Sequence, residues 1–251
     1  MARISRRSFF KFAGATAATA AVDGGALAAT QQAPQTTSPL AYTFFNTAEV
    51  AFIEPAVERL IPADETGPGA LDAGVPFYID KQLGGAWGAG ERLYRSGPWQ
   101  AGTAAQGYQL QYTPAELFRN GLRGILTDLG RRGVTSFAKL GPQDQDAYLK
   151  TLQEGKLDLE GVPSGTFFES LLALATEGYF SDPVYGGNRN MVAWKMIGFP
   201  GAYASYYELV DQHGIHYTRA PMSLAENGGG VIHIRPDIPA ALHPGMHKGG
   251  K

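Results

Sequence analysis

Two stretches of the sequence carry the signature with which an α-helix begins. Asn46-Thr47-Ala48-Glu49 and Thr113-Pro114-Ala115-Glu116 each place a capping side chain three residues before a glutamate, which is the arrangement of a capping box. Apolar residues follow both motifs at the three- and four-residue spacing of one helix face. The sequence therefore predicts two helices in separate parts of the chain, each with one buried face.

Glycine and proline divide the rest of the chain into further helical segments. The pattern predicts helices over residues 73–83, 142–154, 164–178, 191–197 and 203–212, one short strand over 231–234, and an extended tail over 236–251. The stretch 84–107 is rich in Gly, Trp and Tyr and has no clear period, so we expect a long ordered loop. The predicted fold class is mainly α: an irregular helical domain with long ordered loops and an extended C-terminal tail.

The first 28 residues have the composition of an export signal. Adjacent arginines, an aromatic pair and a lysine precede a weakly apolar Ala/Thr/Gly-rich run over residues 12–22. This order is typical of a twin-arginine signal, whose recognition residues here are Arg6, Arg7, Phe9 and Lys11. The run is shorter and less apolar than the roughly 20 residues that cross a bilayer. A membrane anchor and a disordered basic tail are therefore the less favoured alternatives.

The signal predicts the domain organisation and the location of the protein. Ala26-Leu27-Ala28 fits the small-x-small pattern that precedes a signal-peptidase cut. We expect a signal peptide over 1–28, a flexible leader over 29–44, one helical domain over 45–235 and the tail over 236–251. A twin-arginine signal predicts export of a folded protein to the periplasm.

Composition excludes several kinds of site. The chain contains no cysteine, which excludes disulfides, thiolate iron–sulfur sites and covalent haem attachment on this chain. The formal net charge is −2, and the signal segment is itself basic, so the remaining body is mildly acidic. A mildly acidic body argues against nucleic acid or anionic lipid as the main partner.

No motif for chemistry stands out. The glycines of residues 84–90 lack the dinucleotide-binding spacing and follow a helix rather than a strand. His213 and His216 are spaced for chelation, but Gly214 separates them and no supporting carboxylate motif is present. An acidic cluster is compatible with acid–base chemistry or with helix capping and surface charge; it comprises Asp64, Glu65, Asp72 and Asp80. We assign no catalytic, cofactor-binding or metal-binding residue.

Three segments together resemble one protein family. They are residues 61–70, residues 77–83, and residues 180–201, in which Asp-Pro-x-Tyr-Gly-Gly-Asn is followed by Trp-Lys-x-Ile-Gly-Phe-Pro-Gly. The last segment is the most specific, because it is too long to arise from turn chemistry alone. Over residues 45–201 the chain resembles the gluconate 2-dehydrogenase subunit 3 family, the small subunit of membrane-associated flavoprotein dehydrogenases.

The resemblance implies a non-catalytic subunit of a larger complex. In such complexes a large FAD-containing subunit oxidises a sugar, polyol or sugar acid, and a multi-haem cytochrome c subunit, where present, passes electrons to quinone. The small subunit carries the export signal for itself and for the flavoprotein, uses the twin-arginine translocon, and helps the large subunit mature. The resemblance implies no cofactor on this chain and supplies no catalytic residues.

A partner that stays bound during export needs a large interface, and such interfaces favour Trp, Tyr and Arg. The candidate interface residues are Trp87, Tyr94, Arg95 and Trp99 in the aromatic loop and Tyr185, Asn188, Arg189 and Trp194 around the Gly-Gly turn. Packing within the chain is the alternative for each of them. Two other functions remain open: a stand-alone periplasmic oxidoreductase, and a general periplasmic chaperone or binding module.

Overall fold

The computed structural model describes residues 41–94, 96–202, 211, 213–214 and 219–224. The described part is mainly helical, as the sequence predicts. Its only paired strands form one hairpin with two residues in each strand. The α-helices are α2 (Thr47–Leu60), α3 (Val75–Gly84), α4 (Pro114–Arg131), α5 (Pro142–Gln153), α6 (Ser164–Phe180) and α7 (Val192–Ile197). The hairpin strands are β1 (Asp158–Leu159) and β2 (Val162–Pro163), and the 3-10 turns are η1 (Ala104–Gln106), η2 (Phe137–Lys139), η3 (Pro183–Tyr185) and η4 (Arg189–Met191).

Both predicted capping boxes are confirmed. The Asn46 side chain accepts a hydrogen bond of 3.0 Å from the Glu49 amide, and the Glu49 carboxylate accepts one of 2.9 Å from the Asn46 amide. Thr113 and Glu116 exchange the same pair of bonds at the start of α4, at 3.2 and 2.8 Å. These bonds satisfy amides that a helix N-terminus otherwise leaves without partners.

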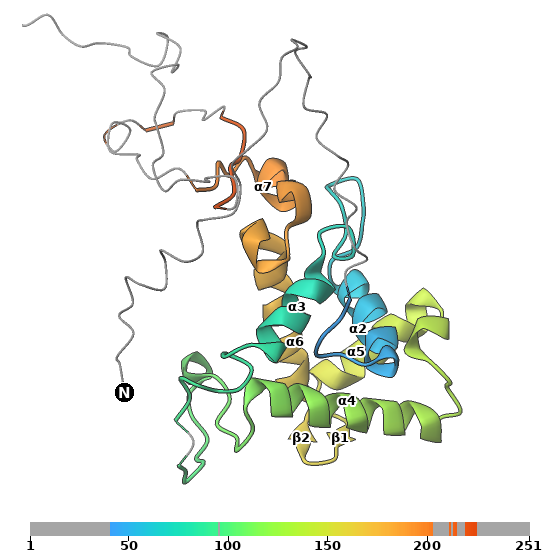
Figure 1. The fold of residues 1–251 in the computed structure, drawn as a ribbon. Coiled ribbons are helices and arrows are strands. Elements are labelled where there is room, and N and C mark those ends of the chain that lie inside the picture. Colours follow the sequence, from blue (N-terminus) through green and yellow to red (C-terminus); the bar gives the residue numbers. More distant parts are fainter. Residues whose placement is uncertain (1–40, 95, 203–210, 212, 215–218, 225–251) are drawn as a thin grey trace, which may run out of the picture. The chain divides into compact units, whose positions relative to one another are not determined.

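Helix α6 is the centre of the domain. It contacts α2, α3, α4, α5 and α7. Its inner face meets a row of buried rings, in which Phe167 packs against Phe118 with ring centroids 5.1 Å apart and against Phe52 at 6.4 Å. Phe137 extends this row at 4.8 Å from Phe52. The core is thus a layer of aromatic and aliphatic side chains around one helix. Figure 1 shows the ribbon of α6 in the middle of the helices.

Helix α6 also runs past the glycine at which the sequence predicts its end. It continues two residues beyond Gly178, to Phe180. A methyl group on Gly178 would lie 2.8 Å from the Tyr78 ring, so this glycine lets α3 and α6 approach closely and does not end the helix. Ser164 is the first helical residue, and its hydroxyl accepts a hydrogen bond of 3.2 Å from the Leu157 amide.

The segment before α2 is fixed to α3. The buried Asp80 carboxylate accepts hydrogen bonds from the Thr43 amide and hydroxyl and from the Phe44 and Phe45 amides, all between 2.8 and 2.9 Å. Tyr42 stacks on Phe77 with centroids 4.6 Å apart. The residues from Tyr42 onward therefore pack on the domain, although composition alone placed the leader up to residue 44.

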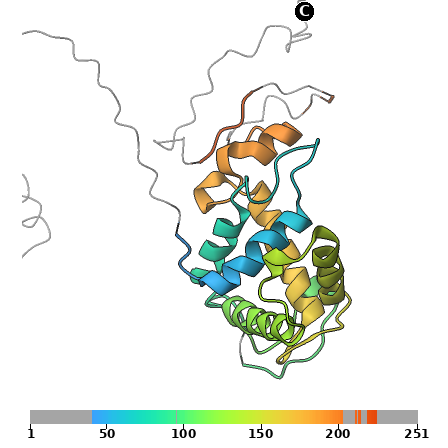
Figure 2. The same ribbon diagram turned by 90° about the vertical axis from the view of Figure 1, so that its right-hand side faces the viewer.

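Figures 1 and 2 show α7 at one end of the helical domain and α4 with the β1–β2 hairpin at the other. Outside the described residues lie the predicted signal peptide, most of the leader, the helix over 203–212 except for residue 211, the strand over 231–234 and the tail over 236–251. Among the described helices, none is both long and apolar enough to cross a lipid bilayer.

Candidate partner interface

The aromatic loop lies between α3 and α4 and presents its large rings to solvent. Its base is fixed, because the Ala115 amide donates a hydrogen bond of 3.0 Å to the Gly88 carbonyl. Trp87, Tyr94 and Trp99 are exposed, and Tyr94 is the most exposed of them at 74%. The candidate Arg95 falls outside the described residues.

A pocket of about 160 Å³ lies between the aromatic loop and residues 108–112, which lead into α4. Its lining residues are Leu93, Tyr94, Trp99, Gln106, Tyr108, Gln109, Leu110, Gln111 and Tyr112. The Tyr108 hydroxyl donates a hydrogen bond of 3.2 Å to the Tyr112 carbonyl. Burial, followed by the negative charge of Glu116, raises the pKa of Tyr108 to about 12. The raised pKa means that the folded chain holds this proton more tightly than an exposed tyrosine does.

Two of the four candidates around the Gly-Gly turn are buried. Asn188 has no exposed surface. Its side-chain amide donates a hydrogen bond of 2.9 Å to the Ser181 carbonyl and accepts one of 2.9 Å from the Ala193 backbone amide. Trp194 is 6% exposed, and its indole N–H donates 2.8 Å to the Phe180 carbonyl. Both side chains pack within the chain and set the position of α7.

The other two candidates at this turn differ from each other. Tyr185 has its ring half exposed. Arg189 is partly buried. Its backbone amide donates a hydrogen bond of 2.9 Å to the Ala73 carbonyl, and its guanidinium lies 5.5 Å from the centre of the Phe77 ring. One nitrogen of this guanidinium, Nη2, is buried without a hydrogen-bond partner. Of the four candidates, only Tyr185 therefore presents its side chain largely to solvent.

The turn that leads into α7 holds three non-glycine residues in the left-handed backbone region. The φ angles are 42° at Asn188, 57° at Asn190 and 55° at Met191. Such a residue costs on the order of 1–3 kcal/mol and persists only where surrounding contacts impose it. The two hydrogen bonds of the Asn188 side chain supply such contacts, so the direction of α7 is fixed by packing beyond the turn itself.

A groove of about 360 Å³ lies beside α7. It is lined by Leu60, Ile61, Pro62, Asp64, Thr66, Gly67, Pro68, Thr176, Tyr179, Phe180 and Met196. The buried Tyr179 donates a hydrogen bond of 2.6 Å to the Pro68 carbonyl, which joins the loop after α2 to α6. Phe180 and Met196 border the groove and are exposed.

Sequence reasoning did not select Phe180 or Met196 as interface residues. A usable signal exists in α6, because its apolar residues surround the helix instead of lining one face, and such a helix needs cover on more than one side. For Met196 the sequence offers no comparable signal, because α7 has only six residues.

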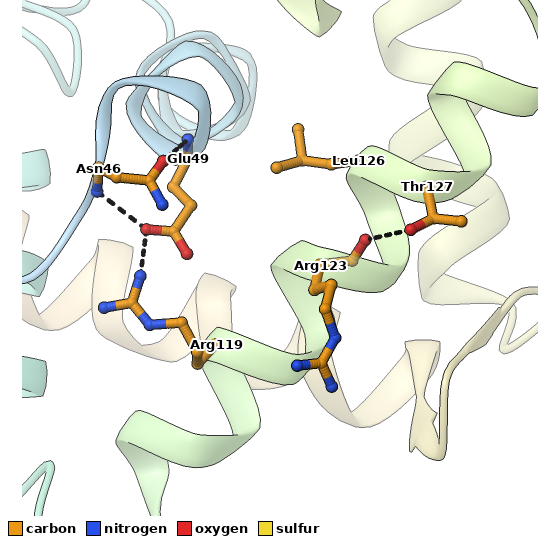
Figure 3. Close-up of a pocket in the computed structure, with 6 residues that line it drawn as sticks. All are labelled: Asn46, Glu49, Arg119, Arg123, Leu126 and Thr127. Atoms are coloured by element: carbon orange, nitrogen blue, oxygen red, sulfur yellow. Dashed lines mark hydrogen bonds and ion pairs between the residues drawn. The ribbon is translucent and has the colours of Figure 1, made fainter.

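A second pocket, of about 460 Å³, lies between the start of α2 and α4 (Figure 3). The Glu49 carboxylate of α2 accepts a charged hydrogen bond from Nη1 of Arg119 on α4. Nη2 of the same guanidinium donates a hydrogen bond of 2.8 Å to the Phe44 carbonyl. Arg123 points away from Glu49 and donates 3.0 Å to Glu160. Each arginine is thus paired with a carboxylate, and the Glu49–Arg119 pair links α2 to α4.

The acidic candidates serve local structure where the described residues show their bonds. Asp80 holds the segment before α2, and the Asp64 carboxylate accepts 2.8 Å from the Thr66 amide within its own turn. Within the described ranges, no group of three His, Asp or Glu side chains is placed to hold a metal ion. His213 is exposed, and His216 lies outside those ranges.

The family comparison spans this whole arrangement. The model of the family described as gluconate 2-dehydrogenase subunit 3 matches residues 47–201, more than half of the chain. The chain belongs to the gluconate 2-dehydrogenase subunit 3 family. The matched region of this subunit 3 protein begins at the first residue of α2 and ends just after α7, so it contains both the aromatic loop and the groove. No curated protein and no solved structure matched the chain.

Proposed function

We propose that this chain is the non-catalytic small subunit of an exported, FAD-dependent dehydrogenase that oxidises a sugar, polyol or sugar acid. In this role it escorts the catalytic subunit through the twin-arginine translocon to the periplasm and stabilises it there. The observation that carries the proposal is the family match over residues 47–201. In this proposal the FAD belongs to the catalytic subunit, and a cytochrome subunit, where the complex has one, carries haem c and holds the complex at the membrane.

Two features of the chain support an escort. The twin arginines Arg6 and Arg7 stand before the folded domain, and this export route accepts folded cargo. The domain also exposes large apolar rings such as Trp87 and Tyr185, which suit contact with another protein.

The proposal is tested by expressing the full chain together with a candidate FAD-containing dehydrogenase subunit from the same genome. Replacing Arg6 and Arg7 by lysine blocks recognition of the signal, so both subunits are expected to remain in the cytoplasm. Cell fractionation and an immunoblot of each subunit measure the outcome. A flavoprotein that reaches the periplasm with this variant, or without the chain, contradicts the escort role.

The alternative of a stand-alone oxidoreductase is tested with the isolated chain. The purified protein, given gluconate, glucose, sorbitol or fructose and a dye acceptor, is expected to show no turnover until the flavoprotein is added. Turnover by the chain alone contradicts the proposed function.

A further inference from the structure

Most of the exposed large apolar side chains in the described part of the chain come from the segment between the middle of α6 and residue 224. Among the described residues, eight of the thirteen large apolar side chains that are exposed lie in residues 172–224, and four lie in the aromatic loop. We call four of the eight the α7 patch: Phe180, Met196, Ile197 and Phe199. Single exposed apolar residues are ordinary, but a contiguous group marks an interaction site.

Buried side chains beneath the α7 patch contact three of its four members. Trp194 donates its hydrogen bond to the Phe180 carbonyl and meets the Phe199 ring edge-on, with centroids 5.1 Å apart. The Met196 sulfur lies 4.0 Å from the Tyr179 hydroxyl, at the border of the groove. The patch and the groove therefore form one surface.

Contacts among the described residues hold α7 away from the core on this side. The left-handed turn at residues 188–191 and the buried Asn188 side chain fix α7 in a direction that leaves Met196 and Ile197 outside the core. The groove between Ile61, Pro68 and Met196 is accordingly not filled by the described part of the chain.

We propose that the α7 patch and its groove are the docking surface for the catalytic subunit, and that the groove receives an apolar side chain of that subunit. This inference rests on the proposed function. It favours the α7 end over the aromatic loop, which the sequence had offered as an equal candidate.

The size and charge of the surface fit a protein partner. The four side chains of the α7 patch are between 37% and 55% exposed, and at about 150–250 Å² for a large side chain they present on the order of 300 Å², which suits the apolar centre of an interface. A standard interface buries about 800 Å² on each partner, with an apolar centre and a polar rim. The exposed Lys195 and Asp64 carry opposite charges beside the patch, which suits such a rim and not the basic cluster that an anionic lipid surface attracts.

The test uses the full chain, coexpressed with a candidate flavoprotein subunit from the same genome and recovered through a tag on that subunit. Met196→Glu places a carboxylate where the inference puts an apolar contact, and an unpaired charge is not tolerated in a buried interface. We expect the recovered amount of this chain to fall about tenfold or more.

A matched control in the aromatic loop and a second variant on α7 test whether the loss of recovery is specific to the α7 patch. Leu93→Glu makes the same kind of change in the aromatic loop at a side chain that is 46% exposed, and recovery is expected to stay within about twofold. Ile197→Glu, at 55% exposure, repeats the change on α7 at a position outside the core, and it is expected to reduce recovery as Met196→Glu does. Thermal unfolding of each isolated variant verifies that the domain is intact.

The outcomes separate the inference from the proposed function. If the unchanged chain is not recovered with the flavoprotein, the proposed function fails. If it is recovered and both α7 variants are recovered equally well, or if Leu93→Glu reduces recovery as much as they do, the docking surface is wrong while the proposed function stands. If the isolated chain dimerises and Met196→Glu abolishes only that dimer, the occupant is a second copy and the inference is overturned.

Discussion

The indole N–H of Trp194 donates a hydrogen bond of 2.8 Å to the carbonyl oxygen of Phe180, and this bond ties α7 to the last residue of α6. The carbonyls at a helix end have no partner within the helix, so the indole satisfies one of them. The same ring packs edge-on against Phe199. A single side chain thereby joins the end of the central helix, the short helix α7 and the segment that follows.

Replacing Trp194 by Phe is expected to destabilise the domain by about 1–3 kcal/mol, because the Phe180 carbonyl loses its donor and the smaller ring leaves a gap. Chemical denaturation followed by circular dichroism measures this change. Trp87→Phe is the matched control, since the Trp87 ring is exposed, and it is expected to change stability by less than about 0.5 kcal/mol. Equal effects of the two substitutions contradict the assigned role of Trp194.

The turn before α7 makes a second prediction. Asn188→Ala removes both side-chain hydrogen bonds but keeps a side chain at positive φ, so the loss is expected to be about 2–4 kcal/mol. Asn190 is also at positive φ but is exposed, and Asn190→Gly is expected to leave stability unchanged or raise it by up to about 1 kcal/mol. If Asn190→Gly destabilises the domain as much as Asn188→Ala, the backbone at Asn190 is not held in the left-handed region.

The elements that the sequence predicts well are those whose cause is local. The two capping boxes need only a side chain and an amide three residues apart, and both are present where the residues indicate. Gly133, with a φ of 73°, follows the end of α4 as a C-terminal glycine is expected to do.

The features that the sequence does not predict depend on contacts between distant residues. Gly178 resembles a helix stop, but its effect comes from the Tyr78 ring, a hundred positions earlier in the chain. The β1–β2 hairpin is too short for a strand pattern, and its turn places Glu160 and Gly161 at positive φ without the usual Asn-Gly signal.

The candidate interface divides in the same way. Aromatic and polar residues near a glycine turn look alike in sequence whether they face a partner or the core. The structure buries Asn188 and Trp194 and leaves Tyr185 exposed, because the left-handed turn folds α7 back onto α6.

Asp80 provides a third prediction. Its carboxylate accepts four hydrogen bonds from residues 43–45, and an asparagine in its place has only one acceptor oxygen. Asp80→Asn is expected to lower the free energy of unfolding by about 2–3 kcal/mol and to make the amides of residues 43–45 exchange faster. Hydrogen exchange read by mass spectrometry measures the second effect. Asp72→Asn changes the same charge at an exposed site and is expected to leave both quantities unchanged.

The pKa values of two tyrosines predict a loss of stability in alkali. Burial raises the pKa of Tyr108 to about 12, with Glu116 adding to the effect, and burial raises that of Tyr78 to about 12, with Glu177 adding. An unfolded tyrosine ionises near pH 10. A raised pKa means that the folded state holds the proton more tightly, so this contribution to stability is complete below pH 10 and is lost between about pH 10 and 12.

The melting temperature is therefore expected to fall between about pH 10 and 12. The fall is expected to be smaller in Tyr108→Phe, because phenylalanine has no proton to release. Tyr94→Phe is the control, because the Tyr94 side chain is exposed. If Tyr94→Phe reduces the fall of the melting temperature in alkali as much as Tyr108→Phe does, the assignment of this pH dependence to Tyr108 is wrong.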